Sequence, residues 1–574
     1  MSDSSKWTRR SFLDAVGRAG GAAAVYETMV AMGMIGVPAA FAGPPQVAAD
    51  RGRGQRVVIL GAGIAGLTAA YELNNAGYEV IVLEANRRAG GRSNTVRRGD
   101  TIEENTGTKQ VCKFDDHPDF YLNAGPGRLP YHHTAILHYC TLFGVPLEVY
   151  TMMTRANYFQ RDGSWKNRSM VNRRIANDTR GWISELLAKA VVKGHLNKEL
   201  EKKGVDKDQF LSLLTVFGDI DPDDKYDYLG SSRSGYLVQP GIEDCGKLLK
   251  PLKLADLVNS DFWDHRFYQA EEYEWQPTLF QPVGGMDQIW RYGFLQKSPV
   301  GRFIYYNQEV LHVENVTEDG KEKVKIAFRP SGGLAQVVSS ITADWCISTI
   351  PMPILAPILK NNNFDQSYKD AVAGVQFAPT VKVGWQTNSR FWETRDQMYG
   401  GISYTTDPIT QIWYPSWAYF KQKGILTGAY NYDQDAIDFG NYPLQKRLAE
   451  AMKGGMKVHP DFDKHVPIEL GLSIAWQNVP WQLGGWADDW SCDKSIPQTL
   501  LQAEPSGKRF FVAGDQVSYL SGWQEGAVRS AHHVIAQVMK VPMALKTAPM
   551  LEMVEPEASI RKAPGTRRRT RGLP

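Results

Sequence analysis

Residues 56–84 read RVVILGAGIAGLTAAYELNNAGYEVIVLE. The apolar run 56–60 predicts a buried strand, and the glycine-rich turn 61–66 leads into a helix that ends at Ala76-Gly77. A second apolar run at 78–83 predicts another buried strand. Strand, turn, helix and strand in this order predict two parallel strands joined by a helix, and hence an α/β fold.

The three glycines of the turn meet different requirements. Gly61 permits the tight turn, Gly63 removes a side chain that would keep the backbone from a pyrophosphate, and Gly66 lets the helix approach the strand. The helix N-terminus then faces the phosphates. Glu84 closes the second strand, where a carboxylate accepts hydrogen bonds from a ribose diol and repels a 2′-phosphate. The pattern predicts a dinucleotide site and argues against NADP.

The residues that follow indicate which dinucleotide binds. Residues 84–92 read EANRRAGGR, which resembles the extended motif of FAD enzymes of the amine-oxidase group. In that motif a second arginine-glycine loop wraps the pyrophosphate, which assigns Ala85 and Gly91 to the cofactor. Arg92 is the expected phosphate partner, because a guanidinium binds phosphate oxygens bidentately. The alternative is a solvated basic loop after the strand.

Length and charge restrict the class of protein. The 574 residues exceed what one hydrophobic core usually fills, which predicts two or more domains. Residues 561–574 hold six basic and no acidic side chains, and residues 1–56 hold seven basic and four acidic ones. The chain between them has 52 basic against 58 acidic residues, so no broad nucleic-acid surface is indicated. The tail 541–574 is expected to be a solvated end.

The cysteines indicate neither a zinc site nor a disulfide framework. They are odd in number, widely spaced and without a C-x-x-C pair. A single pair in an exported protein stays open as an alternative. The five are Cys112, Cys140, Cys245, Cys346 and Cys492.

The first 42 residues resemble a twin-arginine export signal. Residues 8–13 read TRRSFL, small residues follow, and the triplet AFA at 40–42 is a candidate cleavage site. Charged residues interrupt the apolar region, which is too polar and too short to span a membrane. We expect export to the periplasm or the medium after folding. The alternative is an uncleaved amphipathic helix on a cytoplasmic protein.

Between about residues 56 and 539 the chain resembles the flavin monoamine oxidase superfamily, and most closely its L-amino-acid oxidase branch. The supporting segments are QPVGGM at 281–286, DWCISTIP at 344–351, RFFVAGD at 509–515 and SGWQEGA at 521–527. The resemblance implies that the cofactor is FAD rather than a nicotinamide dinucleotide. It adds these cofactor contacts: Gly127, Arg128, Val310, Gly514, Asp515, Gly522, Trp523 and Ala527.

The same resemblance implies an interleaved architecture. The FAD-binding domain would comprise 54–112, 281–350 and 487–540, and the substrate-binding domain 113–167, 266–280 and 351–486. Residues 168–265, with helical stretches such as 179–194, would form a helical domain that roofs the entrance. Similar enzymes are commonly homodimers or larger homo-oligomers, so we expect one here.

Substrate selection depends on a fixed cation, because an α-carboxylate in a partly dry pocket must be paired. Residues 123–130, NAGPGRLP, resemble the branch's G-P-x-R motif, whose arginine, here Arg128, binds that carboxylate. The resemblance implies that the Tyr414 hydroxyl gives a second hydrogen bond, and that the Gly522 carbonyl receives the amine beside Trp523. The alternatives are a loop-pinning arginine, a core tyrosine and a packing tryptophan.

Trp486 stands where some monoamine oxidases have the cysteine that joins the flavin covalently. An indole offers no such nucleophile, so we expect non-covalent FAD with Trp486 as a ring over the pocket.

The implied reaction is transfer of the Cα hydrogen as hydride to flavin N5, followed by hydrolysis to a 2-oxo acid and ammonia and by reduction of O2 to H2O2. Lys382 precedes FWE at 391–393 by nine residues, as does the family lysine that holds a water at N5. A lysine on a solvated strand face is the alternative. His132 and His133 are expected to be loop or wall residues rather than a base. No metal is expected.

Three other functions stay open. A flavin monooxygenase that decarboxylates amino acids to amides would share the fold and the carboxylate site. A primary-amine or polyamine oxidase would not need Arg128. A non-catalytic FAD-containing protein that binds amino acids is the third alternative. In the main hypothesis the partners are a free L-amino acid and O2.

Overall fold

The computed structural model of the protein describes residues 43–45, 48–332, 337–487, 500 and 509–540. The twin-arginine segment 1–42, the basic tail 541–574 and Cys492 lie outside these residues. Export of the protein and its oligomeric state therefore stay predictions.

A parallel sheet of five strands contains the predicted unit. Its order is β14-β2-β1-β18-β24, and every neighbouring pair is parallel. The strands predicted at 56–60 and 78–83 are confirmed as β1 and β2, with α2 between them. The five strands come from distant parts of the chain: β1 (Arg56–Leu60), β2 (Glu79–Leu83), β14 (Ile304–Tyr305), β18 (Trp345–Ser348) and β24 (Phe510–Val512).

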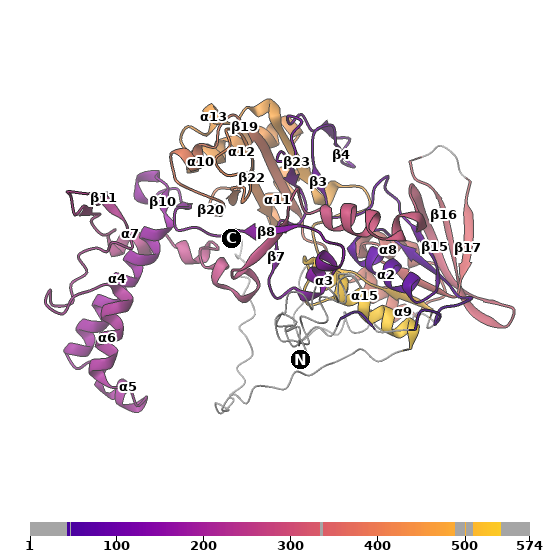
Figure 1. The fold of residues 1–574 in the computed structure, drawn as a ribbon, viewed down its shortest axis with the longest axis horizontal. Coiled ribbons are helices and arrows are strands. Elements are labelled where there is room, and N and C mark those ends of the chain that lie inside the picture. Colours follow the sequence, from indigo (N-terminus) through magenta and orange to yellow (C-terminus); the bar gives the residue numbers. More distant parts are fainter. Residues whose placement is uncertain (1–42, 46–47, 333–336, 488–499, 501–508, 541–574) are drawn as a thin grey trace, which may run out of the picture.

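Alternate residues of β1 enter two different cores. Val57 and Ile59 pack with helices α2 (Ile64–Asn75), α3 (Thr134–Leu142) and α15 (Gln524–Met539) on one face of the sheet. Val58 and Leu60 pack on the other face. That face is covered by a three-stranded sheet and two helices (Figure 1): β15 (Gln308–Glu318), β16 (Lys321–Pro330), β17 (Ser339–Ala343), α8 (Met352–Leu359) and α9 (Gln366–Ala373).

A second, seven-stranded sheet has the order β10-β9-β20-β21-β22-β19-β23. All eight residues of β19 are buried, because strands flank it on both sides and helices pack against the sheet. The strands are β9 (Tyr158–Gln160), β10 (Met170–Val171), β19 (Thr380–Thr387), β20 (Ile402–Thr405), β21 (Gln411–Trp413), β22 (Gly424–Tyr432) and β23 (Gly471–Ala475), and the helices are α10 (Phe391–Thr394), α11 (Asp433–Asn441), α12 (Leu444–Val458) and α13 (Phe462–His465).

Smaller sheets connect these layers. A three-stranded sheet orders β7 (Leu129–Pro130), β13 (Leu279–Pro282) and β8 (Leu147–Tyr150). This sheet places β7, which directly follows Arg128, beside β13, which begins at Leu279. The two-stranded sheets pair β3 (Thr95–Val96) with β6 (Leu122–Asn123), and β4 (Thr101–Glu103) with β5 (Lys109–Val111).

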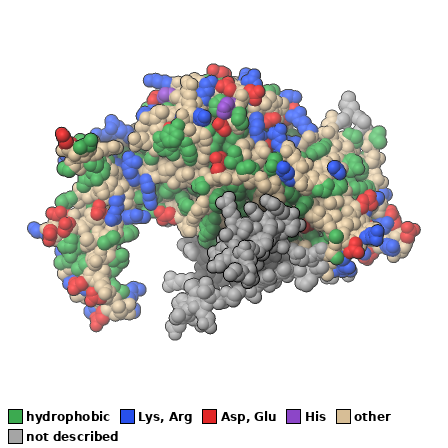
Figure 2. All heavy atoms as spheres, viewed as in Figure 1, with side chains coloured by type: hydrophobic (Ala, Val, Ile, Leu, Met, Phe, Trp, Pro, Cys, Tyr) green, Lys and Arg blue, Asp and Glu red, His purple; other side chains and the backbone are tan. Residues whose placement is uncertain are grey.

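A helical arm projects from the rest of the molecule (Figure 1). Its helices are α4 (Asn172–Val192), α5 (Asn197–Lys202), α6 (Lys207–Gly218) and α7 (Leu254–Val258), with a hairpin of β11 (Tyr236–Val238) and β12 (Lys247–Leu248). Helices α5 and α6 extend outward (Figure 1), and the role of this segment as a roof over an entrance stays a prediction. These helices pack on α4 in a core of their own, and apolar side chains lie among charged ones on the arm's surface (Figure 2).

In total, the observed mixture of helices with parallel and antiparallel strands confirms the α/β class. Among the described residues, none of the helices is both long and apolar enough to cross a membrane.

Candidate functional site

A cavity of about 430 Å³ lies at the carboxyl end of β1. Described residues from distant parts of the chain line it: the glycine turn and the residues after β2, residues 124–126, the start of β15, the segment after β18, single residues of β19, β22 and the turn after β23, residues 481–486, and residues 514–527. Thirteen of the predicted site residues line it: Gly61, Gly63, Glu84, Ala85, Gly91, Arg92, Val310, Trp486, Gly514, Asp515, Gly522, Trp523 and Ala527.

The glycine turn has the geometry that the sequence predicts. Gly61 has φ +100°, which favours glycine. A Cβ on Gly63 would meet no atom within 4 Å, whereas a Cβ on Gly66 would lie 2.1 Å from the Gly61 carbonyl oxygen. Gly63 therefore leaves open space in the cavity, and Gly66 allows the close approach of α2. Gly63 caps α2 without a side-chain bond, which leaves the first N–H groups of the helix for an anion.

Glu84 is held rigidly where β2 ends. Its Oε2 accepts a hydrogen bond from Ala62 N at 2.7 Å, and its Oε1 accepts one from Asn86 N at 2.8 Å. Burial raises the pKa of the Glu84 carboxyl, and the two backbone bonds oppose that shift. The carboxylate is thus oriented on the cavity wall, where the sequence predicts a ribose contact.

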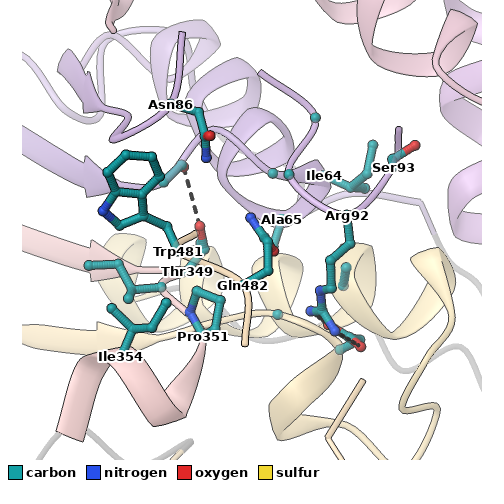
Figure 3. A pocket seen from close by; sticks show the side chains of 18 of the residues that line it. Ile64, Ala65, Asn86, Arg92, Ser93, Thr349, Pro351, Ile354, Trp481 and Gln482 are labelled. Carbon is teal, nitrogen blue, oxygen red and sulfur yellow. Dashed lines mark hydrogen bonds and ion pairs between the residues drawn. The ribbon is translucent and has the colours of Figure 1, made fainter. Parts of the chain in front are cut away.

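Apolar side chains form a slot in the wall of the cavity. Figure 3 shows Trp481, Pro351 and Ile354 together there, with Asn86 opposite them. Val310 lies on the same wall. An apolar slot, an oriented carboxylate and a helix N-terminus without a side-chain cap, all on one cavity, fit the adenine, ribose and pyrophosphate of a dinucleotide. Trp481 and Ile354 belong to no motif that the sequence analysis used.

Arg92 lines the cavity, but its guanidinium already forms an ion pair with the carboxylate of Asp515. Its side chain runs from the α2 side toward the C-terminal segment (Figure 3). Nη1 donates to Asp515 Oδ2 at 3.1 Å and to the Gly485 carbonyl at 2.9 Å, and Nη2 pairs with Asp515 Oδ1. This pairing differs from the prediction that Arg92 binds phosphate bidentately. Asp515 also accepts from Gly522 N at 3.0 Å, so the pair links the two loops.

The opposite end of the cavity is aromatic and lies beside a buried lysine. Tyr430, Trp486 and Trp523 line it together with Gly125. The Lys382 Nζ donates to Gly125 O at 2.5 Å and to Asn123 O at 3.0 Å, and it lies behind the wall that Gly125 forms. Lys382 is 1% exposed, so the alternative of a solvated strand face is wrong. Burial, and then the charge of Arg128, lower its pKa to about 7.

Arg128 is a buried cation in a box of aromatic rings. Its Cζ lies 4.3 Å from the ring centroid of Trp275, 4.8 Å from that of Trp413 and 5.8 Å from that of Tyr150. Its Nε and Nη1 are buried without a hydrogen-bond partner. Arg128 does not itself line the cavity, but Trp275 joins it to the wall, because the Trp275 and Trp523 centroids are 4.9 Å apart. A buried guanidinium with unpaired nitrogens favours an anionic ligand.

Tyr414 is not available to a substrate. Its hydroxyl donates to Ser403 Oγ at 2.8 Å and lies 2.6 Å from His459 Nε2, inside the core of the second sheet. This placement contradicts the prediction that its hydroxyl binds a carboxylate. The neighbouring residue Trp413 faces the site instead, with its ring beside both Arg128 and Lys382.

Gly127 also differs from its predicted role at the cofactor. It does not line the large cavity, and a Cβ there would lie 2.8 Å from the Trp413 ring. Its contribution is space for that ring to pack next to Arg128.

His132 and His133 lie beside the aromatic end rather than in the cavity. The His133 ring centroid is 4.8 Å from that of Trp523, and both Nε2 atoms lie 3.2 Å from Glu274 Oε2. These contacts agree with wall residues. Glu274 and its neighbour Trp275 were missed by the sequence analysis, because no motif marks the stretch around them.

Comparison with known proteins identifies the family of the chain. Residues 64–539 match the family described as flavin containing amine oxidoreductase. The Bacillus subtilis protein YobN, provisionally named an L-amino-acid oxidase, is 25% identical over 508 residues, which cover 85% of this chain and 95% of that protein. The flavin-dependent L-tryptophan oxidase RebO of Lentzea aerocolonigenes is 24% identical over 499 residues, covering 83% and 96%.

The L-amino-acid oxidase of Pseudechis australis is 22% identical over 495 residues, which cover 83% of this chain and 85% of that protein. The family match spans most of the chain and includes α2, α15 and the cavity lining from Ile64 onward. The chain belongs to the flavin-containing amine oxidoreductase family.

Proposed function

We propose that this protein is an FAD-dependent L-amino-acid oxidase. It would convert an L-amino acid, O2 and water into a 2-oxo acid, ammonia and H2O2. Family membership supports a flavin oxidoreductase, and the names of the relatives support the amino-acid substrate. The observation that carries the proposal is the buried Arg128 guanidinium, whose Nε and Nη1 have no hydrogen-bond partner, beside the aromatic end of the cavity. A simple amine has no anionic group to pair with such a cation, whereas an amino acid has its α-carboxylate.

FAD would lie along the cavity with its adenine in the slot near Trp481 and its ribose at Glu84. The α2 N-terminus would hold the pyrophosphate. When bound, the flavin supplies a hydride acceptor for the substrate Cα. Trp486 lines the cavity, and an indole offers no nucleophile to the flavin, which supports non-covalent binding. Trp486 would then cover the flavin end of the site.

The chain's own residues would act mainly by orientation. Arg128 would hold the carboxylate, the Gly522 carbonyl would accept from the amine, and Trp523 and Tyr430 would bound the side-chain pocket. These contacts fix Cα relative to the acceptor, a positional contribution rather than acid–base chemistry. Lys382 would supply a cation or ordered water near the same face, which favours electron transfer to O2.

Product analysis tests the proposal. Mixed anaerobically with an L-amino acid, the purified protein should lose its flavin absorbance, and in air it should form equal amounts of 2-oxo acid, ammonia and H2O2. Amide and CO2 as products would identify a monooxygenase instead. Turnover of decarboxylated amines at equal efficiency would identify an amine oxidase. No bleaching with any L-amino acid in a broad panel would leave a non-catalytic binding protein.

A further inference from the structure

Three side chains of metal-ligand type converge beside the aromatic end of the cavity. His132 Nε2 and His133 Nε2 each lie 3.2 Å from Glu274 Oε2. All three atoms lie within 4.8 Å of one another, which within the described ranges is true of this group alone. The histidines directly precede α3, whereas Glu274 comes from the distant short turn Tyr273–Trp275. Two separate segments of chain thus meet at one point.

We propose that His132, His133 and Glu274 form a binding site for a divalent transition-metal ion, with Zn²⁺ the best fit. Zn²⁺ binds imidazole nitrogen and carboxylate oxygen at about 2.0–2.2 Å, so the edges of its tetrahedron are about 3.3–3.5 Å long. Both histidine-to-glutamate separations are already close to this length. The three atoms lie within 4.8 Å of one another, so binding would draw them together around the ion and leave a fourth position for water.

The ligand set and its burial select the ion. Two imidazoles with one carboxylate suit Zn²⁺ and its transition-metal neighbours, whereas Mg²⁺ and Ca²⁺ prefer oxygen ligands throughout. The His133 side chain is 1% exposed and that of His132 is 13% exposed, but that of Glu274 is 35% exposed. The glutamate thus gives an ion a path from solvent. The two histidine rings are nearly perpendicular, at 83°, with their centroids 4.7 Å apart.

The site is coupled by direct contacts to Arg128. Trp275 follows Glu274 in the chain, and its ring lies against the Arg128 guanidinium and the Trp523 ring. The His133 ring also contacts Trp523. A bound ion would fasten the turn 273–275 to the histidines and hold Trp275 over Arg128. With Trp275 held there, a substrate carboxylate should reach Arg128 more slowly. This effect on the substrate rests on the proposed function.

Calorimetric titration of the flavin-loaded, chelator-treated full chain with ZnCl2 tests the site. We expect one ion per chain, and at least about tenfold weaker binding in Glu274→Gln and in His132→Gln. A matched control is His312→Gln, which removes a histidine 3.8 Å from Glu314 on β15 and should leave binding unchanged. No saturable binding, or equal loss in the control, would overturn the site and leave a cluster held by hydrogen bonds alone.

Flavin absorbance and thermal unfolding establish that each variant is folded and loaded. Turnover then tests the coupling: Zn²⁺ should lower kcat/KM for an L-amino acid in the wild type but not in Glu274→Gln. Equal kcat/KM with and without bound Zn²⁺ would overturn the link to Trp275. Zn²⁺ binding in a protein that oxidises no amino acid would contradict the proposed function and not the metal site.

Discussion

Lys382 and Arg128 are two buried cations on one indole ring. The Lys382 Nζ lies 4.6 Å and the Arg128 Cζ 4.8 Å from the Trp413 ring centroid. Within the described residues, Lys382 donates to two backbone carbonyls rather than to a carboxylate, and Nε and Nη1 of Arg128 have no partner. Two like charges held close together in a dry region favour an incoming anion, and they make the charge of the lysine sensitive to pH.

Oxygen reactivity should therefore depend on pH. Because the pKa of Lys382 is lowered to about 7, its amine is a cation below that pH and neutral above it. If the cation assists electron transfer to O2, the reoxidation rate of the reduced enzyme should fall as pH rises from 6 to 8. Lys382→Met should be slower at pH 6, by about 10²-fold, and should lose this pH dependence. Stopped-flow reoxidation measures both, and an unchanged profile in Lys382→Met would refute the assignment.

Removal of Arg128 should harm amino-acid oxidation far more than amine oxidation. A buried, hydrogen-bonded charge pair costs about 2–5 kcal/mol to break, so Arg128→Ala should lower kcat/KM for L-amino acids by at least about 30-fold. The exposed Arg233 of the helical arm provides the control, Arg233→Ala. Steady-state assays with an amino acid and its decarboxylated amine compare the two. Unchanged turnover of the amino acid by Arg128→Ala would contradict the carboxylate role.

Tyr414→Phe should change stability and leave KM alone. Its hydroxyl bonds to Ser403 and His459 in the core, so its loss leaves buried polar groups unpaired at a cost of about 1–3 kcal/mol. Urea unfolding measures that cost, and KM for L-amino acids serves as the internal comparison. A large rise in KM without a loss of stability would restore the tyrosine to the substrate site.

The contrast between Trp413 and Tyr414 shows what the sequence does not determine. Successive residues at a strand end point to opposite faces, so a motif that contains both aromatics predicts the site but not which ring enters it. β21 ends at Trp413, and only the pairing of this strand with its neighbours settles the direction. Trp275 is harder still, because it reaches Arg128 through tertiary packing and no local pattern marks it.

The glycine turn was predictable because its requirements are local. Strand, turn and helix are adjacent in sequence, and each glycine serves contacts within that unit or at the cavity next to it. The direction of the helical arm was not predictable, because it depends on whether α5 and α6 pack on the body of the protein or on α4. Arg92 shows the same limit: its position on the wall was predicted, but its partner Asp515 lies 423 residues away in the chain.

Alanine at Gly63 and alanine at Gly66 should affect different properties of the protein. A Cβ at residue 63 meets no protein atom, so Gly63→Ala should fold with normal stability but bind FAD at least about tenfold more weakly. A Cβ at residue 66 would lie 2.1 Å from the Gly61 carbonyl oxygen, so Gly66→Ala should lower stability itself. Flavin content after dialysis and thermal unfolding of the apoprotein separate the two. Equal behaviour of the two variants would contradict this division of roles.

Stability should fall as pH rises from about 5 to 7 because of Glu72. Its Oε1 accepts a hydrogen bond from Tyr139 at 2.6 Å, His532 Nε2 lies 2.7 Å from the same hydroxyl, and burial raises the pKa of Glu72 to about 7. The folded state therefore keeps a proton that the unfolded chain loses above its ordinary pKa near 4.5.

Unfolding releases that proton between these two values, so each pH unit in the interval costs the folded state up to about 1.4 kcal/mol. Glu72→Gln has no such proton and should flatten the decline, whereas Glu79→Gln on the exposed end of β2 should not. Urea unfolding at pH 5, 6, 7 and 8 measures the difference between each variant and the wild type. Parallel curves for Glu72→Gln and the wild type would show that Glu72 titrates normally in the folded protein.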